Sequence, residues 1–105
     1  MRNNRYIKDL VDFMNKSVCN FWAVKTISEI LEANGFSQLN PADAWTLKAG
    51  DRRYVVKNHS AIFAFVVGEG GAADGFKIIS AHSDSPGFRI KPNPEMVSDG
   101  GILKL

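Results

Sequence analysis

The stretch that decides the fold is FKIISAHSDSP, residues 76–86. Its first half is mostly apolar, and Ile78, Ile79 and Ala81 leave little room for a solvated face. Such a run is typical of a strand covered on both sides, as the parallel strands of α/β proteins are. Open α/β sheets carry their ligand sites just beyond the ends of such strands. We therefore predict a buried strand at residues 76–81 that presents the residues after it to a functional site.

His82 and Asp84 follow this expected strand. Side chains two positions apart on an extended chain point the same way, so both face one site while Ser83 faces away. A metal-bound imidazole usually donates its other N–H to an acceptor, and aspartate is a common one. The pattern is compatible with a metal site in which His82 is a ligand and Asp84 is its orienting partner. A core strand that ends in an ordinary Ser-Pro turn, with Asp84 bound to nearby backbone amides, explains the same residues, which alone leave both interpretations open.

A family resemblance supports the metal site. Residues 82–86, HSDSP, and residues 88–92, FRIKP, resemble the His-Thr/Ser-Asp-Ser-Pro signature and the trailing Arg-hydrophobic-Lys-Pro of the aspartyl aminopeptidase family of zinc metallopeptidases. The resemblance implies that His82 is a metal ligand and that Asp84 orients it. It also implies two zinc ions in each active site. Their other Asp, Glu and His ligands, and the glutamate that shuttles protons, come much later in a chain several times longer.

The resemblance extends over essentially the whole chain. The further matches are Asn15-Lys16-Ser17, Ala23-Val24, Gly35-Phe36 and the connector residues Leu39, Asp43, Trp45 and Leu47. Residues 18–22 depart from the family, which more often has prolines there, but the departure touches no catalytic residue. The resemblance implies that residues 1–105 are the N-terminal segment of a metallo-aminopeptidase catalytic domain with a three-layer α/β/α architecture. The rest of that domain and its inserted dimerisation domain would be absent from a chain truncated in this way.

The sequence pattern predicts an α/β fold in which two N-terminal helices pack on a mixed sheet. Apolar residues recur at helical spacing over residues 6–15 and again over residues 21–34. Asn34-Gly35 is a strong stop signal, because glycine readily adopts the positive φ that ends many helices, and Phe36 can then fold back on Leu31.

Strand patterns follow the helices. β-branched and aromatic residues predict a hairpin over residues 54–67, with its turn at residues 58–60. Residues 39–50 contain too many turn formers for a regular element. Residues 88–91 alternate as a half-buried strand would, and residues 102–105 begin a similar alternation.

The composition is that of a soluble globular chain, with 45% hydrophobic residues, 23% charged residues and a formal net charge of +2. The charges are scattered, which argues against a nucleic-acid or membrane surface. The basic start does not resemble a secretory signal, and no stretch approaches the ~20 apolar residues of a membrane span. Cys19 is the only cysteine, so the chain forms no internal disulfide and a cytoplasmic location is expected.

His59 is the only other histidine and so a candidate second ligand. It lies at the tip of the expected hairpin, where turn residues belong and where the family has no ligand, so we do not assign it. Arg89 and Lys91 would suit an acidic substrate side chain, but solvated or structural charges on a strand explain them more simply.

The resemblance implies a zinc-dependent aminopeptidase that removes N-terminal residues, by preference Asp or Glu, from peptides with a metal-activated water. The segment alone is expected to be inactive, because His82 with Asp84 supplies one ligand where a catalytic zinc takes three. The alternatives are a family member that prefers neutral residues and a stand-alone, non-catalytic α/β binding or interaction module. Peptide substrates are the expected partners of the enzyme, which we expect to be a homo-oligomer. We expect the isolated chain to self-associate through open strand edges.

Overall fold

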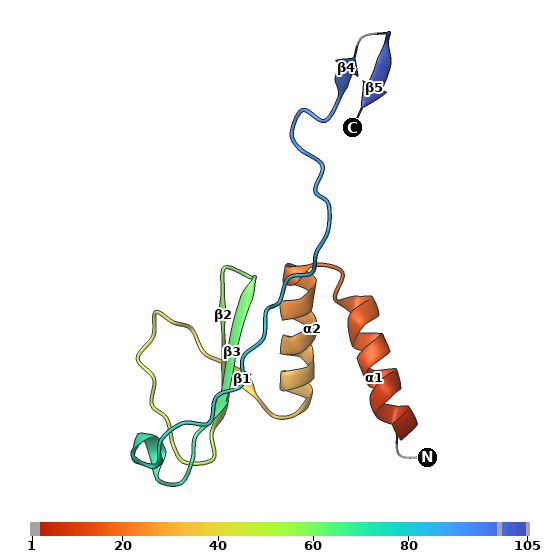
Figure 1. Cartoon of the computed structure of the whole chain (residues 1–105). Helices are drawn as coiled ribbons and strands as arrows, with labels where there is room; N and C mark the ends of the chain where they lie inside the picture. Colours follow the sequence, from red (N-terminus) through yellow and green to blue (C-terminus); the bar gives the residue numbers. More distant parts are fainter. Residues whose placement is uncertain (1–2, 99, 105) are drawn as a thin grey trace.

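Two helices and a three-stranded sheet form the body of the protein in the computed structural model, which describes residues 3–98 and 100–104 (Figure 1). The sheet has the order β1-β2-β3, in which β1 is parallel to β2 and β2 is antiparallel to β3. The elements are α1 (Asn3–Lys16), α2 (Asn20–Ala33), β1 (Ser37–Gln38), β2 (Arg52–Lys57), β3 (Ala61–Val66), the short 3₁₀ helix η1 (Gly71–Asp74), β4 (Met96–Ser98) and β5 (Ile102–Lys104). The expected packing of two helices on a mixed sheet is confirmed.

Helix α2 ends at Ala33, next to the stop signal Asn34-Gly35 in the sequence. Gly35 adopts a φ of 81°, a backbone conformation that is strained for residues with a side chain. The Gly35 N–H donates to the carbonyl of Glu32 and the Phe36 N–H donates to the carbonyl of Leu31, each at 3.0 Å. These two bonds satisfy carbonyls that the last turn of a helix leaves unpaired, and they return the chain toward the sheet.

The hairpin of β2 and β3 is also confirmed. Its register pairs Lys57 with Ala61, and the turn between them closes with a hydrogen bond of 3.2 Å from the Ser60 N–H to the Lys57 carbonyl. Asn58 and His59 adopt φ values of 52° and 55°. Two consecutive positive φ values are the signature of a type I′ turn, whose twist matches that of the strands it joins. His59 is therefore a turn residue.

The core lies between α2 and the sheet face that carries Tyr54. Ala23, Val24 and Tyr54 are buried there, and Tyr54 is only 1% exposed. The Tyr54 hydroxyl donates to Glu32 Oε1 at 2.5 Å. This hydrogen bond, and after it burial, raise the pKa of the Tyr54 hydroxyl above its ordinary value, because both favour the neutral form. The contact fixes the C-terminal part of α2 on the middle of β2.

The irregular loop of residues 39–50 lies on the far side of the sheet from α2 (Figure 1). Trp45 fastens it, because its ring stacks on Phe65 with centroids 6.4 Å apart and its Nε1–H donates to the Asn40 carbonyl at 2.8 Å. The absence of a regular element at residues 39–50 agrees with the sequence analysis.

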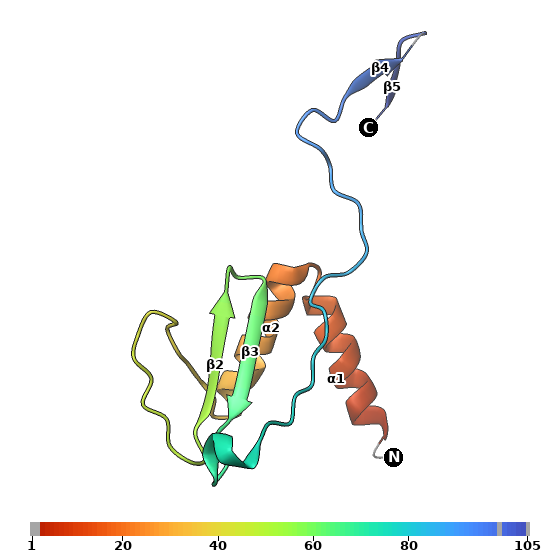
Figure 2. The ribbon, with the colours of Figure 1, turned by 60° about the vertical axis from the view of Figure 1, so that its left-hand side comes forward.

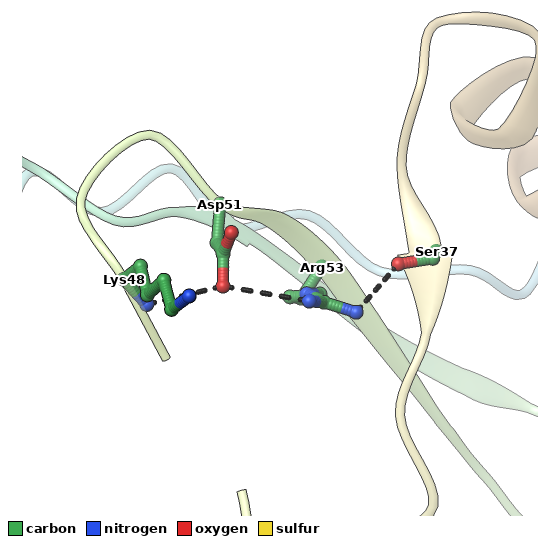
Figure 3. Close-up of polar contacts among 4 residues, drawn as sticks. All are labelled: Ser37, Lys48, Asp51 and Arg53. Atoms are coloured by element: carbon green, nitrogen blue, oxygen red, sulfur yellow. Dashed lines mark hydrogen bonds and ion pairs between the residues drawn. The ribbon is translucent and has the colours of Figure 1, made fainter. Parts of the chain in front are cut away.

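A polar cluster ties this loop to β1 and β2 (Figure 3). Asp51 Oδ2 accepts a hydrogen bond of 3.1 Å from the backbone N–H of Lys48 and lies 3.4 Å from the Arg53 guanidinium. Arg53 also donates to Ser37 Oγ at 2.8 Å. The guanidinium thus bridges the short parallel strand β1 and the turn that precedes β2.

The buried strand expected at residues 76–81 does not form. Residues 75–91 have no regular secondary structure, and Ile79 is 100% exposed. Figure 2 shows this segment passing β3 and then leaving the body of the protein. A strand that is apolar on both faces needs neighbouring strands and a layer on each side. The described residues supply neither at this position, so the prediction of a covered strand is wrong for this chain.

The half-buried strand expected at residues 88–91 is absent for the same reason, since Phe88 and Ile90 are exposed and no strand within residues 3–98 and 100–104 pairs with them. Farther along, β4 and β5 pair as an antiparallel hairpin apart from the body (Figure 1). The strand character of residues 102–104 is thereby confirmed, and Leu105 lies outside the described residues. Over residues 3–98 and 100–104, no helix combines the length and the apolar character needed to cross a membrane.

The substitution Tyr54→Phe tests the seating of α2 on the sheet. We expect the free energy of unfolding to fall by about 1–2 kcal/mol, because a buried hydroxyl loses its bond to a charged carboxylate. The matched control Tyr6→Phe alters a tyrosine that is 75% exposed, and surface changes of this kind usually stay within about 0.5 kcal/mol. Urea unfolding followed by circular dichroism measures both variants. Equally small effects would contradict the role assigned to Tyr54.

Comparison of the wild type with Tyr54→Phe also tests the raised pKa of the Tyr54 hydroxyl. Unfolded tyrosine loses its proton near pH 10, by the usual value of about 10 for this side chain, whereas folded Tyr54 keeps its proton to higher pH. The stability contributed by the protonated hydroxyl is therefore complete below the unfolded pKa and is lost as the pH rises through the folded pKa. The stability difference between wild type and Tyr54→Phe should shrink in that range, and a growing difference would refute the assignment.

Candidate metal centre

The imidazole of His82 is held against Asp84. His82 Nδ1 lies 2.8 Å from the backbone carbonyl oxygen of Asp84 and 3.2 Å from its carboxylate Oδ1. The carbonyl oxygen only accepts hydrogen bonds, so Nδ1 is the donor and carries the proton. In the neutral ring, Nε2 then has the lone pair. This is the tautomer in which an imidazole binds a metal through Nε2 while its other nitrogen is oriented by an acceptor.

The local backbone accounts for this arrangement. Pro86 confines the residue before it to extended conformations, which keeps the end of the segment drawn out. The Oγ of Ser83 donates to the Ser60 carbonyl at 2.8 Å, so Ser83 faces the hairpin. His82 and Asp84, one residue to either side, lie together away from it. The structure thus brings the two candidate residues into contact, as their spacing indicates, while their chemical roles remain predictions.

The pair alone does not make a complete metal site. The side chains of His82 and Asp84 are 81% and 77% exposed. In the described ranges 3–98 and 100–104, no three His, Cys, Asp or Glu side chains come together as possible ligands. A catalytic zinc takes three protein ligands and keeps one position open. The donor chemistry of His82 and Asp84 therefore fits one ligand of such a site together with the group that orients it.

His59 lies in the β2–β3 turn, beside a cavity of about 680 Å³ between α2 and the hairpin. Trp22, Lys25 and Glu29 of α2 also line this cavity, and Lys25 Nζ lies 4.7 Å from the centre of the Trp22 ring. His82 is not among the residues around it. Sequence patterns do not reveal this cavity, because it arises from the packing of a helix on a hairpin that is distant from it in sequence.

The two cations considered for an acidic substrate, Arg89 and Lys91, are both exposed. Lys91 Nζ lies 3.3 Å from the sulfur of Met96, near β4. These positions agree with the interpretation of both residues as solvated charges. The candidate centre is therefore limited, within the described part of the chain, to His82 and Asp84.

Comparison with known proteins assigns the family. The model of the family described as Aminopeptidase I zinc metalloprotease (M18) matches residues 13–103. The chain belongs to the M18 family. The matched region contains the HSDSP and FRIKP motifs, and the resemblance recognised in them is confirmed.

Individual M18 relatives agree with this assignment. The chain is 50% identical to the "Probable M18 family aminopeptidase 2" of Clostridium novyi (strain NT) and 45% identical to the protein of that name from Clostridium acetobutylicum. Both matches cover 100% of this chain and 25% of the relative. The protein of the same name from Pseudomonas paraeruginosa is 40% identical over 91% of this chain and 22% of its own length. The chain spans about a quarter of the length of the two Clostridium relatives.

We expect zinc to bind this M18 chain weakly, through His82 Nε2. One imidazole backed by a carboxylate lacks the closed set of ligands that gives structural zinc sites about 10–16 kcal/mol of binding free energy. The dissociation constant should therefore exceed about 10 μM, with fast exchange. NMR titration of the imidazole nitrogens should show zinc-dependent shifts at His82 Nε2, and Asp84→Asn should weaken the binding.

The control is His59→Asn, which suits the positive φ of the turn and should leave the shifts of His82 unchanged. Tight zinc binding that survives His82→Asn would show that the metal is held elsewhere.

Proposed function

We propose that this chain is the N-terminal part of the catalytic domain of an M18 aminopeptidase, in which His82 is a zinc ligand and Asp84 orients it. The observation that carries the proposal is the contact of His82 Nδ1 with both the carbonyl oxygen and the carboxylate of Asp84, at 2.8 and 3.2 Å. The family description as a zinc metalloprotease supports the choice of metal.

Zinc in such a site polarises the scissile carbonyl and lowers the pKa of a bound water. The task of His82 is to offer the Nε2 lone pair in a fixed direction. Asp84 holds the proton on Nδ1 and fixes the direction of the ring, because it accepts the hydrogen bond from that nitrogen. The remaining ligands, a second zinc and the carboxylate that moves the proton to the leaving amine belong, in this proposal, to the larger part of the protein that the relatives contain.

The proposed reaction is removal of the N-terminal residue from a peptide. The named M18 aminopeptidases among the relatives support the reaction class. A preference for N-terminal Asp or Glu rests on the resemblance of the HSDSP and FRIKP motifs, and a preference for neutral residues is the alternative within the family. We also propose a cytoplasmic location and a homo-oligomeric whole enzyme. The free thiol of Cys19 suits a reducing compartment.

A non-catalytic binding module is the second candidate for the chain acting by itself. It is favoured by the incomplete donor set in residues 3–98 and 100–104 and by the cavity between α2 and the hairpin. The two candidates differ in a simple way. An aminopeptidase segment gains activity when the missing ligands are supplied, and a binding module does not.

A chimera supplies those ligands. Residues 1–105 replace the matching N-terminal quarter of the Clostridium novyi relative, with which they share 50% identity. We expect zinc-dependent cleavage of an aspartyl peptide by the chimera and none by the isolated chain. His82→Asn should abolish the activity of the chimera, because an amide oxygen is a poor zinc ligand. Asp84→Asn should lower zinc affinity or activity about 10- to 100-fold.

His59→Asn is the matched histidine control and should leave the activity of the chimera unchanged. If His82→Asn proves as active as this control, His82 is not a ligand and the proposal is wrong. An inactive but folded chimera, seen as native circular dichroism without turnover, would favour the binding module. A panel of peptides that begin with Asp, Glu, Leu or Ala decides the side-chain preference.

A further inference from the structure

Ser83 lies between the two candidate site residues and faces the other way. Its Oγ donates to the backbone carbonyl of Ser60 at 2.8 Å. A serine hydroxyl often bonds backbone groups a few residues away along the chain, but this bond joins residues 23 positions apart. It is therefore a tertiary contact, which attaches the segment that carries His82 and Asp84 to the β2–β3 turn.

Burial marks the same position. Ser83 is half-buried, whereas every other residue from 72 to 93 is exposed. Its acceptor Ser60 is half-buried as well, next to the exposed residues 57–59. A hydrogen bond that is partly shielded from water is stronger than one in open solvent. The bond between Ser83 and Ser60 is therefore suited to hold this part of the segment in place.

The hairpin holds the acceptor of this bond. The Ser60 N–H donates to the Lys57 carbonyl at 3.2 Å, and Asn58 and His59 have the positive φ values of the turn. Among the described residues, the backbone hydrogen bonds of turns and loops give the Ser60 carbonyl no donor. This carbonyl is therefore a fixed point at the start of β3 that is free to accept the Ser83 hydroxyl.

The alternation of an extended chain relates this contact to the candidate site. Successive side chains of extended backbone point to opposite faces. Because the Ser83 hydroxyl is bound at the turn, the side chains of His82 and Asp84 lie on the other face, where His82 Nδ1 is 3.2 Å from Asp84 Oδ1. A slip of the segment by one residue would exchange the two faces and direct the imidazole toward the hairpin.

We propose that Ser83 is a positioning residue: its hydroxyl, bound to the Ser60 carbonyl, sets the place and the direction in which the His82–Asp84 pair meets zinc. This inference rests on the proposed function, in which His82 is a zinc ligand. It adds the β2–β3 turn to the parts of the chain on which zinc binding depends, although neither Ser60 nor Ser83 is itself a ligand.

Two variants of nearly the same shape isolate the hydroxyl. Ser83→Thr keeps it and Ser83→Val replaces it with a methyl group, and both residues are β-branched and favour extended backbone. On the 105-residue chain, heteronuclear NOE values of the backbone amides measure how well residues 82–84 are ordered. We expect Ser83→Val to lower these values and Ser83→Thr to keep them. Equal values in the two variants overturn the proposal.

The zinc affinity of the chimera measures the consequence for the site. There the His82 imidazole has to meet a zinc ion held by further ligands, so a misplaced ring weakens binding. We expect Ser83→Val to raise the zinc dissociation constant about three- to tenfold, the effect of losing one hydrogen bond between neutral groups. Ser83→Thr should restore the wild-type value. The matched control Ser60→Ala removes a side-chain hydroxyl but keeps the accepting carbonyl, and it should bind zinc like wild type.

His82→Asn separates this inference from the proposed function. If His82→Asn leaves the zinc affinity of the chimera unchanged, the proposed function fails, and the inference fails with it. If His82→Asn weakens zinc binding while Ser83→Val binds zinc like Ser83→Thr, His82 is a ligand and the positioning role of Ser83 is wrong. A lower melting temperature of Ser83→Val at unchanged zinc affinity also overturns the inference, because the hydroxyl then only stabilises the fold.

Discussion

The part-buried hydrogen bond from Tyr54 to Glu32 is the interaction on which the rest of the described structure depends. It fixes α2 on β2, and β2 in turn supports β3 through an antiparallel ladder. The turn of that hairpin carries Ser60, whose carbonyl accepts the bond from Ser83. Ser83 lies between His82 and Asp84 in the sequence. The position of the candidate metal ligand His82 therefore depends on the packing of α2 on β2. A substitution that loosens α2 is therefore expected to loosen the site as well, although no residue of α2 belongs to the site.

Features encoded by neighbouring residues were predictable from sequence, and features that depend on distant partners were not. Gly35 ends α2, and Asn58 with His59 forms the turn of the hairpin, because each needs only a local positive φ. Contact between His82 and Asp84 follows from spacing along extended backbone. The apolar composition of residues 76–81 predicts a buried strand. A strand forms only beside neighbouring strands, and the described residues do not provide them at this position. Sequence patterns likewise give no sign of the Tyr54–Glu32 bond, whose partners lie far apart along the chain.

Among the described residues, the edge position of β3 and the small donor set at His82 have a common physical explanation. A sheet edge and a catalytic zinc both require groups from several segments of chain, brought together by tertiary packing. The relatives named as M18 aminopeptidases are about four times longer than this chain, which covers 25% of them.

We have proposed that His82 is a zinc ligand and that Asp84 sets its orientation. The most direct measurement is anomalous diffraction at the zinc edge from crystals of the chimera with the Clostridium novyi relative. We expect a zinc ion about 2.0–2.1 Å from His82 Nε2, the usual distance for a zinc-bound imidazole nitrogen, with Nδ1 still hydrogen-bonded to Asp84. A fully occupied zinc site from which His82 is absent, or one that His82 approaches through Nδ1 with Asp84 displaced, would contradict it.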